Sequence, residues 1–549
     1  MIHRIRGYVL PSVGLLAFAL LGLGFYSPGF WYGLLAVGPL LGLGIYDYFQ
    51  PKHSVLRNYP ILGHLRFALE DIGPELHQYF VESNTDGRPF SREQRSLVYE
   101  RAEDITDAKP FGTELDLYEA GYRWINHSIS PSPVIEDPSK NMRVKVGTEV
   151  CDKPYSVSLL NISAMSFGAL SPAAILALNA GAKMGGFAHN TGEGGLSRYH
   201  REPGGDLIFQ FGTGYFGCRT EDGRFDAAQF EETARLDQVK MIELKLSQGA
   251  KPGHGGILPG AKVSKEIAEA RGVPAGKDCI SPRAHTAFHT PIELLEFIAH
   301  LRSWSGGKPV GFKLCIGDPV ELLSVCKAML ETGLSPDFIT IDGAEGGTGA
   351  APVEFSDHLG VPLQEGLLLA NDALVGCGLR DRIGLAASGK RLSAFDIASA
   401  MAMGADWCNA ARPFMFAIGC IQAQTCHTNE CPVGVCTQDP KLYRALVVEE
   451  KAKRAYCFHR RTLESLAELT SAAGLEHPCE LQPQHIWERL GPTEARTLEE
   501  IHERLEPGQL LDGKASGRLQ TYWSRASARS FGNAPAGLSV ARRNALAGP

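Results

Sequence analysis

The sequence predicts a (β/α)8 TIM barrel that carries an N-terminal transmembrane helical hairpin and a helical C-terminal extension. From about residue 155, short apolar runs that end in loops rich in Gly, Ser or Asn alternate with Ala- and Leu-rich helical stretches. This alternation is typical of parallel strands joined by helices. Two charge-free apolar stretches precede the region, and a charged stretch with helical periodicity, 441–475, follows it.

Eight apolar runs are expected to be the barrel strands, which suits a fold of about 250 residues. They are 157–162, 187–189, 207–211, 241–245, 310–314, 338–341, 383–387 and 406–409. Chemistry in this fold lies at the carboxyl ends of the strands. The polar residues of this chain gather in the loops just after these runs, so we expect the active site there.

Composition excludes some classes of function. Gly accounts for 61 of the 549 residues without a collagen-like period, which places the excess in turns and ligand-binding loops. The net charge is −7 and no long basic run occurs, so nucleic acid is not expected as a partner. The 13 Cys are too dispersed for a disulfide scaffold. Their clustering at 420–436 suggests metal binding in a reducing compartment.

The first 50 residues are expected to form a transmembrane helical hairpin. The stretches 8–26 and 30–46 carry no charge, and each approaches the ~20 residues that cross a ~30 Å hydrocarbon core. A Ser-Pro-Gly turn separates them. Positive charge flanks both ends, at Arg4, Arg6, Lys52 and Arg57. This pattern predicts membrane anchoring with the catalytic part in the cytoplasm. A cleaved signal peptide and a hydrophobic packing or dimer hairpin are the alternatives.

The rest of the chain divides into three predicted parts. Residues 51–150 are interpreted as a connector that packs on the barrel and includes a helix over 91–99. Residues 151–440 would hold the barrel with a cysteine loop at 420–436. Residues 441–549 would form the C-terminal extension, whose last twenty residues are expected to be disordered.

Three closely spaced cysteines are the strongest chemical signal. Cys420, Cys426 and Cys431 lie in a Gly- and Pro-bounded loop, and Pro432 follows the last of them. This pattern indicates thiolate ligands of an iron–sulfur cluster, and three ligands suggest three irons. Zinc sites usually use paired Cys-x2–4-Cys motifs, so zinc fits poorly. Cys436 is either a fourth ligand or an inert packed thiol.

Loops after the later strands indicate a phosphate site and a planar ligand. Ser388-Gly389-Lys390 and Ala410-Ala411-Arg412 follow the seventh and eighth runs, where many barrels bind phosphate. The loop 342–349 contains four glycines, which lets backbone approach a flat ligand closely. A surface turn is the alternative for Ser388-Gly389-Lys390, because Gly-Lys is common in such turns, whereas a plain turn after a strand would need only one or two of the glycines at 342–349.

Two lysines interrupt apolar strands. Lys245 and Lys313 would be costly to bury without a partner. A flavin that gains negative charge on reduction is one natural partner. A salt bridge to Glu243, Asp342 or Glu345 is the structural alternative.

These features together resemble the FMN-binding synthase domain of glutamate synthases. The matching segments run in order over about 155–440. They are 162–171, 190–195, 248–253, 258–262, 280–282, 342–349 and 420–435. The N-terminal hairpin and the 50–150 segment resemble a stand-alone, membrane-associated branch, the FMN-binding glutamate synthase family proteins.

The resemblance implies an FMN- and [3Fe-4S]-dependent oxidoreductase of glutamate biosynthesis. Electrons from an external donor, such as ferredoxin or a reductase subunit, would pass through a cluster on Cys420, Cys426 and Cys431 to FMN. Reduced FMN would then reduce 2-iminoglutarate, formed from 2-oxoglutarate and ammonia, to L-glutamate.

The resemblance also implies roles for individual residues. Those expected to act in catalysis are Lys313, Lys245 and Glu193. Those expected to contact FMN are Ser163, Met165, Ser166, Gly168, Asn190, Gln248, Lys313, Asp342, Gly343, Glu345, Gly346, Gly347, Ser388, Gly389, Ala411 and Arg412. Those expected to bind substrate are Lys251, Lys262 and His254.

Several departures from the family pattern bear on function. No glutaminase domain is recognisable, so release of ammonia from glutamine is not expected. His254 stands where the pattern has Glu, Arg283 begins a segment where it has Pro-Pro-His-His, and Cys436 stands where it has Ala. A membrane-tethered amino-acid or amine dehydrogenase that passes electrons to a membrane or ferredoxin-type acceptor is therefore an alternative. A non-catalytic membrane scaffold is a third.

Overall fold

The computed structural model describes residues 2–105, 107–147, 150–513, 515 and 517–532, and it divides into two compact units, Met1–Glu93 and Gln94–Pro549. The expectation of a disordered C-terminal tail falls mostly on residues 533–549, which lie outside the described residues. The second unit begins well before residue 151, because part of the segment interpreted as a connector folds with the barrel.

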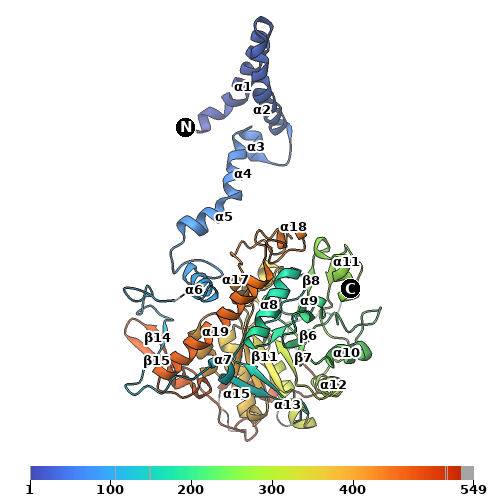
Figure 1. Ribbon diagram of the computed structural model, residues 1–549, viewed down its shortest axis with the longest axis vertical. Helices are drawn as coiled ribbons and strands as arrows, with labels where there is room; N and C mark the ends of the chain where they lie inside the picture. Colours follow the sequence, from blue (N-terminus) through green and yellow to red (C-terminus); the bar gives the residue numbers. More distant parts are fainter. Residues whose placement is uncertain (1, 106, 148–149, 514, 516, 533–549) are drawn as a thin grey trace, which may run out of the picture. The chain divides into compact units, whose positions relative to one another are not determined.

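A closed barrel of parallel strands is the centre of the second unit (Figure 1), and the barrel prediction is confirmed. The strands, in order around the barrel, are β4 (Leu160–Ile162), β5 (His189–Asn190), β6 (Leu207–Phe211), β7 (Val239–Lys245), β10 (Val310–Leu314), β11 (Phe338–Asp342), β12 (Gly384–Ser388) and β13 (Trp407–Ala410). β13 pairs with β4 and closes the ring.

The first predicted strand differs from the observed one. The run 157–162 divides into β3 (Tyr155–Ser158), which pairs with β2 (Arg143–Val146), and β4, which belongs to the barrel. The pairing partner changes between Ser158 and Leu160, because the backbone N–H of Leu159 donates to Met142 and not to a barrel strand. The residues on both sides of this break are similarly apolar, so the sequence pattern did not reveal the boundary between β3 and β4.

Helices follow the strands and cover the barrel, and several begin at residues with clear capping chemistry. The main ones are α8 (Pro172–Gly185), α10 (Ala227–Ala234), α12 (Pro291–Trp304), α13 (Pro319–Thr332), α15 (Leu363–Gly376), α16 (Ala394–Ala402) and α17 (Arg412–Ala417). Ser171 caps α8, and a capping box of Thr290 with Glu293 starts α12. These caps satisfy backbone N–H groups that the helices leave free.

The amino-terminal ends of the strands are closed by an apolar cluster. Its buried residues are Val146, Val157, Ala188, Ile208, Met241, Phe338, Ala386 and Trp407. Phe338 and Trp407 are the first residues of their strands, so β2, β3 and these side chains close the end opposite the loops that carry chemistry. This end of such barrels serves stability.

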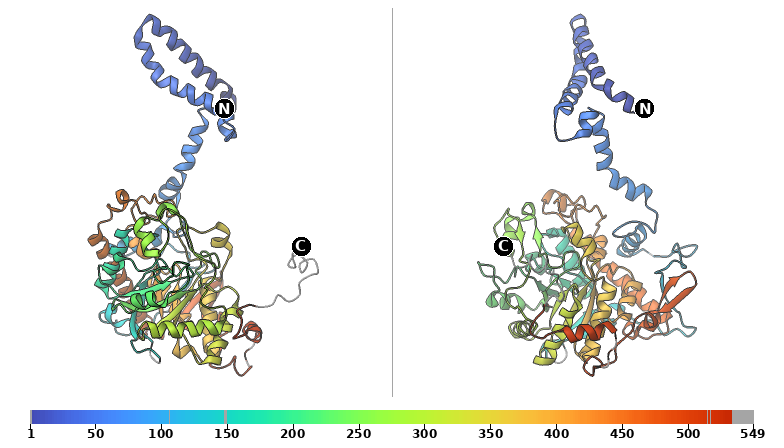
Figure 2. Two further views of the ribbon diagram at one scale, coloured as in Figure 1. Left: turned by 90° about the vertical axis from the view of Figure 1, so that its right-hand side faces the viewer. Right: turned by 180° about the vertical axis from the view of Figure 1, so that it is seen from behind.

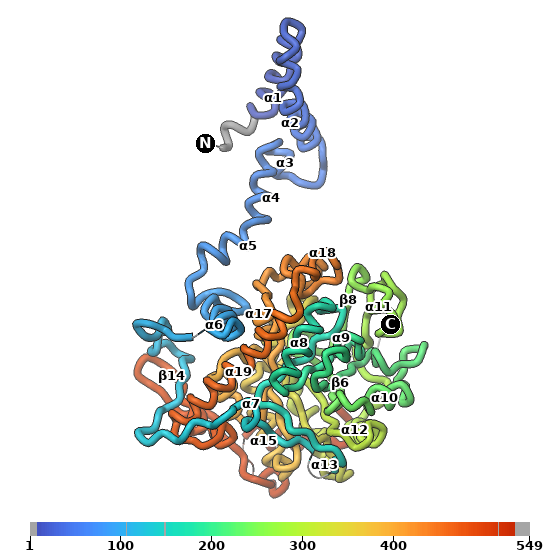
Figure 3. The backbone as a smooth tube through the Cα atoms, viewed as in Figure 1, coloured from blue at the N-terminus to red at the C-terminus, as the bar shows by residue number. Residues whose placement is uncertain are grey.

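A long helix after the cysteine loop packs on the barrel's outer layer. α19 (Val448–Ala472) runs along α8 (Figures 1 and 3). A Cβ at Gly181 would lie 2.7 Å from the carbonyl oxygen of Ala452, so the two backbones approach too closely for a larger residue. The C-terminal region is mainly helical, as expected, but β14 (Ile486–Gly491) and β15 (Glu494–Thr497) form a sheet with β1 (Arg123–Ile125).

The first unit contains two long apolar helices. α1 (Ile2–Tyr26) and α2 (Trp31–Phe49) lie side by side and antiparallel (Figure 2). The spans 8–26 and 28–49 are long and apolar enough to cross a membrane, and both are mostly exposed. The short helices α3 (Ser54–Asn58) and α4 (Gly63–Asp71) follow. The carboxylate of Asp47 anchors them, because it accepts hydrogen bonds from Ile61 N–H at 2.9 Å and from His64.

Candidate active site and cysteine loop

The predicted site residues gather at the carboxyl ends of the strands. Ser163 directly follows β4, and its hydroxyl lies 3.3 Å from that of Ser388 at the end of β12. Gly389 follows with φ 138°, a conformation that favours glycine. The two serines come from loops that are 225 residues apart in sequence, and both side chains are buried. They form one wall of the barrel mouth.

The two strand lysines are each paired with a carboxylate. Lys313 Nζ lies 3.4 Å from Asp342 Oδ2, and Lys245 Nζ lies 2.8 Å from Glu193 Oε1. The lysines occupy opposed positions of the β7–β10 pair. The structural alternative of a salt bridge therefore applies to Lys313 through Asp342, whereas the partner of Lys245 is Glu193 and not one of the carboxylates considered from the sequence.

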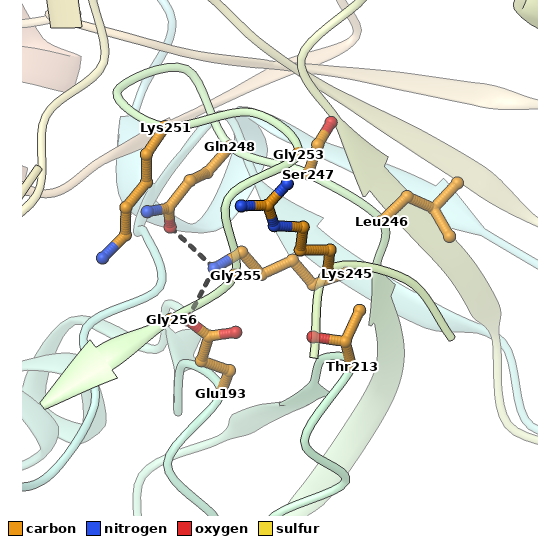
Figure 4. Close-up of a pocket in the computed structure, with 11 residues that line it drawn as sticks. Glu193, Thr213, Lys245, Leu246, Ser247, Gln248, Lys251, Gly253, Gly255 and Gly256 are labelled. Carbon is orange, nitrogen blue, oxygen red and sulfur yellow. Dashed lines mark hydrogen bonds and ion pairs between the residues drawn. The ribbon is translucent and has the colours of Figure 1, made fainter. Parts of the chain in front are cut away.

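A small polar pocket opens beside Lys245 (Figure 4). Its enclosed space is narrow, about 20 Å³, and widens to about 310 Å³ when the open mouth is included. Its lining residues are Glu193, Thr213, Lys245, Leu246, Ser247, Gln248, Lys251, Gly253, Gly255, Gly256 and Arg283. The ammonium of Lys245 lies between Glu193 and the amide oxygen of Gln248, which it contacts at 2.6 Å.

Positive charge dominates the pocket. The cations of Lys245, Lys251 and Arg283 face one carboxylate, Glu193. Burial lowers the pKa of Lys251 to about 8, although Glu193 opposes this effect. Burial pulls the pKa of Glu193 upward, but the adjacent ammonium of Lys245 outweighs it and the pKa lies below its usual value. The pocket is therefore suited to an anionic ligand.

The two loops beside the pocket, 248–251 and 342–349, approach each other closely at glycine residues. A Cβ at Gly249 would overlap the carbonyl oxygen of Gly343, and one at Gly347 would overlap the guanidinium of Arg412. The carboxylate of Asp342 accepts a hydrogen bond from Gly249 N–H at 3.1 Å. These contacts hold the 248–251 and 342–349 loops together and leave room only for glycine.

Some predicted cofactor residues have structural partners. The Asn190 amide donates to Glu243 at 2.7 Å, and Gln210 and Thr340 donate to the same carboxylate. This buried network fills the barrel interior. The Glu345 carboxylate accepts from Leu363 N–H at 3.0 Å, at the start of α15. Met165 and Gly168 lie in the loop after β4.

Two predicted substrate residues lie outside the pocket lining. The ammonium of Lys262 donates to the carbonyl oxygens of Cys426 at 2.9 Å and Ala169 at 3.3 Å, beside the cysteine loop. The His254 ring packs edge-on against Phe355, and its Nδ1 is buried without a hydrogen-bond partner among the described residues. Of the three, only Lys251 lines the pocket.

Two residues at the site were not singled out from the sequence. Thr213 lines the pocket and donates to the carbonyl of Pro282. Arg271 ends α11 (Lys265–Arg271), and its guanidinium donates to Ser166 Oγ at 3.3 Å and to Phe167 O at 3.2 Å. Arg271 belongs to the segment between β7 and β10, and its guanidinium reaches the loop that follows β4. The sequence signal for it is weak, because a terminal helix arginine is common.

The cysteine loop lies against the barrel mouth. Its backbone leaves α17, and Cys420 N–H donates to Met415 O. The hydroxyl of Tyr99, on α6 (Arg92–Ala102), donates to the carbonyl of Cys420 at 2.7 Å. The helix expected over 91–99 thus contributes to the anchoring of this loop. Gln422, Gln424 and Asn429 all have positive φ, which indicates a tightly folded loop.

The thiols of this loop interact with one another. A hydrogen bond from the Cys436 thiol lowers the pKa of Cys426 to about 6 against the effect of burial, and Lys262 and Arg412 add to the lowering. Burial raises the pKa of Cys420 to about 12. Within the described ranges, no set of three His, Cys, Asp or Glu side chains converges on a single metal ion. Ligands of a cluster bind different irons, so they need not converge on one point.

Comparison with known proteins gives a consistent result. Residues 127–476 match the family model described as the conserved region in glutamate synthase. The chain is 41% identical over 494 residues to the glutamate synthase large subunit-like protein YerD of Bacillus subtilis (strain 168), which covers 83% of this chain and 94% of that protein. It is 33% identical over 341 residues to an archaeal-type glutamate synthase (NADPH) of Thermotoga neapolitana, covering 62% of this chain and 64% of that one.

Proposed function

This chain belongs to the glutamate synthase family, and we propose that it reduces 2-iminoglutarate to L-glutamate with electrons from an external donor. It is an oxidoreductase acting on CH–NH2 groups. 2-Oxoglutarate and ammonia would form the imine with loss of water. Two electrons and two protons would then convert the imine into the amino acid, and the donor would be oxidised by two electrons.

The observation that carries the proposal is the cationic pocket beside the barrel mouth. Lys251 and Arg283 offer positive charge to the carboxylates of a 2-oxo acid. Lys245 and Glu193, 2.8 Å apart, form a pair that can hold a proton near the reacting carbon and nitrogen. A dicarboxylate would bring its own negative charge to a site where cations outnumber carboxylates.

The chemistry of the mouth fits FMN. Ser163 and Ser388 would hold its phosphate together with Gly389 and the Ala411–Arg412 turn. Side chains are excluded at Gly249, where a Cβ would overlap the backbone of Gly343, and at Gly343, where it would overlap the side chains of Glu345 and Leu363. The absence of side chains there would let a planar ring lie against the loops. Met165 and Ser166 would lie beside the ring. Bound FMN would supply two-electron transfer between donor and imine.

Lys313 would have an electrostatic role toward the flavin. Its ammonium is buried and only 3.4 Å from Asp342. It would face the N1/O2 edge of bound FMN, where a reduced flavin carries negative charge. The ion pair with Asp342 would orient the Lys313 ammonium toward that edge.

The donor set of the cysteine loop fits an iron–sulfur cluster. Two cations, the buried Lys262 and the half-buried Arg412, interact electrostatically with the thiols of this loop, and Arg412 also interacts with the Asp342 carboxylate. Positive charge at low exposure is stabilised by nearby negative charge, and thiolates on iron would supply it. Cys420, Cys426 and Cys431 would ligate the cluster, which relays electrons from a ferredoxin-type donor or a reductase subunit.

We further propose that α1 and α2 anchor the enzyme to a membrane with its catalytic part in the cytoplasm. Leu15, Phe18 and Leu35 are exposed by 71%, 79% and 74%, as expected of lipid-facing side chains. A signal sequence also begins with such a helix, but it does not account for the second one.

A second candidate function is oxidation of an amino acid or amine, with electrons passing to a membrane acceptor. The observation that favours it is Arg283, which lines the pocket and replaces a residue of the family pattern. An added cation there would change which acid binds.

Anaerobic turnover of the full-length, detergent-purified protein tests the proposal. With 2-oxoglutarate, ammonium and reduced ferredoxin, glutamate should form, and omission of ammonium should abolish it. Bleaching of the oxidised flavin by an amino acid, without glutamate synthesis in the first assay, would favour the second function. Protein that lacks both FMN and iron after anaerobic purification would contradict both and favour a scaffold.

A further inference from the structure

Arg283 is a cation of the polar pocket that no other group neutralises within the described part of the chain. The Lys245 ammonium lies 2.8 Å from Glu193 Oε1 (Figure 4), and Lys251 Nζ donates to the carbonyl oxygen of Ala350 at 2.9 Å. Arg283 lines the same pocket, is exposed, and has no hydrogen-bond or ion-pair partner among the described residues. A guanidinium in this situation can bind a carboxylate through two parallel hydrogen bonds.

The chain on the N-terminal side of Arg283 is fixed to the wall of the pocket. Thr213 Oγ1 donates to Pro282 O at 2.6 Å, and Ser281 N–H donates to Gly256 O at 2.9 Å. Thr213 and Gly256 both line the pocket. The backbone position from which the Arg283 side chain starts is therefore set by residues of the pocket itself.

A buried tyrosine fixes the chain on the C-terminal side of Arg283. The Tyr215 hydroxyl accepts from Thr286 N–H at 3.0 Å and from Ala287 N–H at 3.1 Å, and it lies 3.1 Å from His285 Nδ1. Tyr215 has φ 48°, a left-handed conformation that is uncommon for residues other than glycine. Such a conformation persists where the surrounding contacts determine it. One hydroxyl thus holds three consecutive residues of the segment.

His285 joins this segment to the strand that carries the pocket's lysine. Its Nε2 lies 2.9 Å from Lys245 O and donates to it, because a carbonyl oxygen only accepts. Burial lowers the pKa of His285 to about 4, so the ring is neutral near pH 7 and has its single proton on Nε2. Nδ1 then accepts from the Tyr215 hydroxyl. Both ring nitrogens have partners, so Tyr215, His285 and the end of β7 form one fixed unit.

We propose that Arg283 binds the distal carboxylate of a dicarboxylic 2-oxo acid, and that Tyr215 is the positioning residue that holds Arg283 in place. The inference rests on the proposed function and names the substrate feature that the pocket selects. The Lys245–Glu193 pair would stand beside the reacting carbon, and the carboxylate bonded to that carbon would stay with it. Because the enclosed space is only about 20 Å³, the rest of the acid must extend toward the open mouth, where Arg283 is exposed.

Calorimetric titration of the oxidised, full-length, detergent-purified protein measures recognition without turnover. 2-Oxoglutarate and 2-oxopentanoate form a matched pair, because they share a carbon skeleton and the second has a methyl group in place of the distal carboxylate. Wild type should bind 2-oxoglutarate more tightly. Arg283→Met should reduce this preference about tenfold, the effect of one hydrogen bond to a charged group, with little change for 2-oxopentanoate. Lys277→Met, which removes an exposed cation outside the pocket, should keep the preference.

Tyr215→Phe tests the positioning role through a double-mutant cycle. Phenylalanine keeps the ring, whose centroid lies 5.7 Å from that of Phe225, and removes only the hydroxyl. The single variant should lose part of the preference for 2-oxoglutarate, whereas the same change in Arg283→Met should reduce it no further. Equal weakening of both acids in both backgrounds would overturn the positioning role. Thr213→Val replaces Tyr215→Phe in the cycle if that variant does not retain FMN, because Thr213 holds the same segment.

The binding and turnover assays separate this inference from the proposed function. Equal affinity of wild type for the two acids, or an unchanged preference in Arg283→Met, would overturn the assignment of Arg283 and leave glutamate synthesis standing. A preference that is lost in Arg283→Met, in a protein that makes no glutamate, would support the assignment and contradict the proposed function.

Discussion

Lys245 and Lys313 are opposed in register on the adjacent strands β7 and β10, yet their ammonium groups turn to different carboxylates. Lys245 pairs with Glu193 at the polar pocket, and Lys313 pairs with Asp342 at the start of the glycine loop. Two like charges on neighbouring strands would repel each other in a buried mouth. Each ammonium instead lies beside a carboxylate of its own, which offsets this repulsion.

Lys313 should contribute both to the stability of the fold and to activity, and a second substitution at Asp342 should distinguish the two contributions. Lys313→Met leaves Asp342 buried without its cation, which typically costs about 3–5 kcal/mol, and it should also lower turnover by about 100-fold. Lys313→Met combined with Asp342→Asn should recover much of the stability but none of the activity. Thermal unfolding and steady-state assays measure the two effects. Recovery of activity in the double variant would contradict a role of Lys313 toward the flavin.

Substrate binding should weaken in alkaline solution. The pKa of Lys251 is lowered to about 8 by burial, so the ammonium is charged below that pH and neutral above it. The apparent affinity for 2-oxoglutarate should therefore fall as pH rises through about 8. Lys251→Arg should move this limb of the kcat/KM profile to higher pH, because a guanidinium stays charged. An unchanged limb would exclude Lys251 as its origin.

Lys262 should affect the cluster more than the substrate. Its ammonium contacts the carbonyl of Cys426, not the pocket. Lys262→Met removes a positive charge beside the thiols, and a nearby positive charge stabilises the electron that a reduced cluster gains. The cluster should therefore become harder to reduce, which a potentiometric EPR titration measures. Lys265→Met, an exposed neighbour, is the control. A raised KM with an unchanged potential would restore the substrate role expected from the sequence.

Gly249 should be intolerant of a side chain. A Cβ there would overlap the carbonyl of Gly343, which belongs to the opposing loop. Gly249→Ala should therefore displace the loops and reduce FMN content sharply. Gly317→Ala is the control, since no atom lies within 4 Å of a Cβ at that position. Absorbance of released flavin per chain gives the comparison, and equal FMN content in the two variants would contradict the close approach.

The N-terminal unit should determine membrane association. The full-length chain should sediment with membranes and resist a carbonate wash, whereas a fragment from Gln94 onward, the second compact unit, should stay in the supernatant with its FMN. Mass spectrometry of the membrane-bound protein should find residues 1–50 intact. A shortened N-terminus would indicate a signal peptide, and a soluble full-length chain would indicate a packing hairpin.

The sequence pattern identified the barrel strands because each strand is a short apolar run that is followed by a loop rich in Gly, Ser or Asn. The run 310–314 agrees with β10 residue for residue, and 207–211 agrees with β6. The C-terminal sheet was missed, because the strand β14 includes polar residues and gains its stability from pairing with β1, more than 350 positions earlier. Pairing with a strand so distant in sequence produces no hydrophobic periodicity in either segment.

The sequence by itself determined the fold class, the family and the types of side chain at the mouth, since these depend on short-range patterns and on motifs in order. Only the tertiary structure decided which groups meet. It paired Lys245 with Glu193, placed the Lys262 ammonium on the carbonyl of Cys426 and brought the hydroxyls of Ser163 and Ser388 together. The physical reason is that loops from separate strands converge at one end of a barrel. Distances between their side chains are set by the closed ring and not by their spacing in the chain.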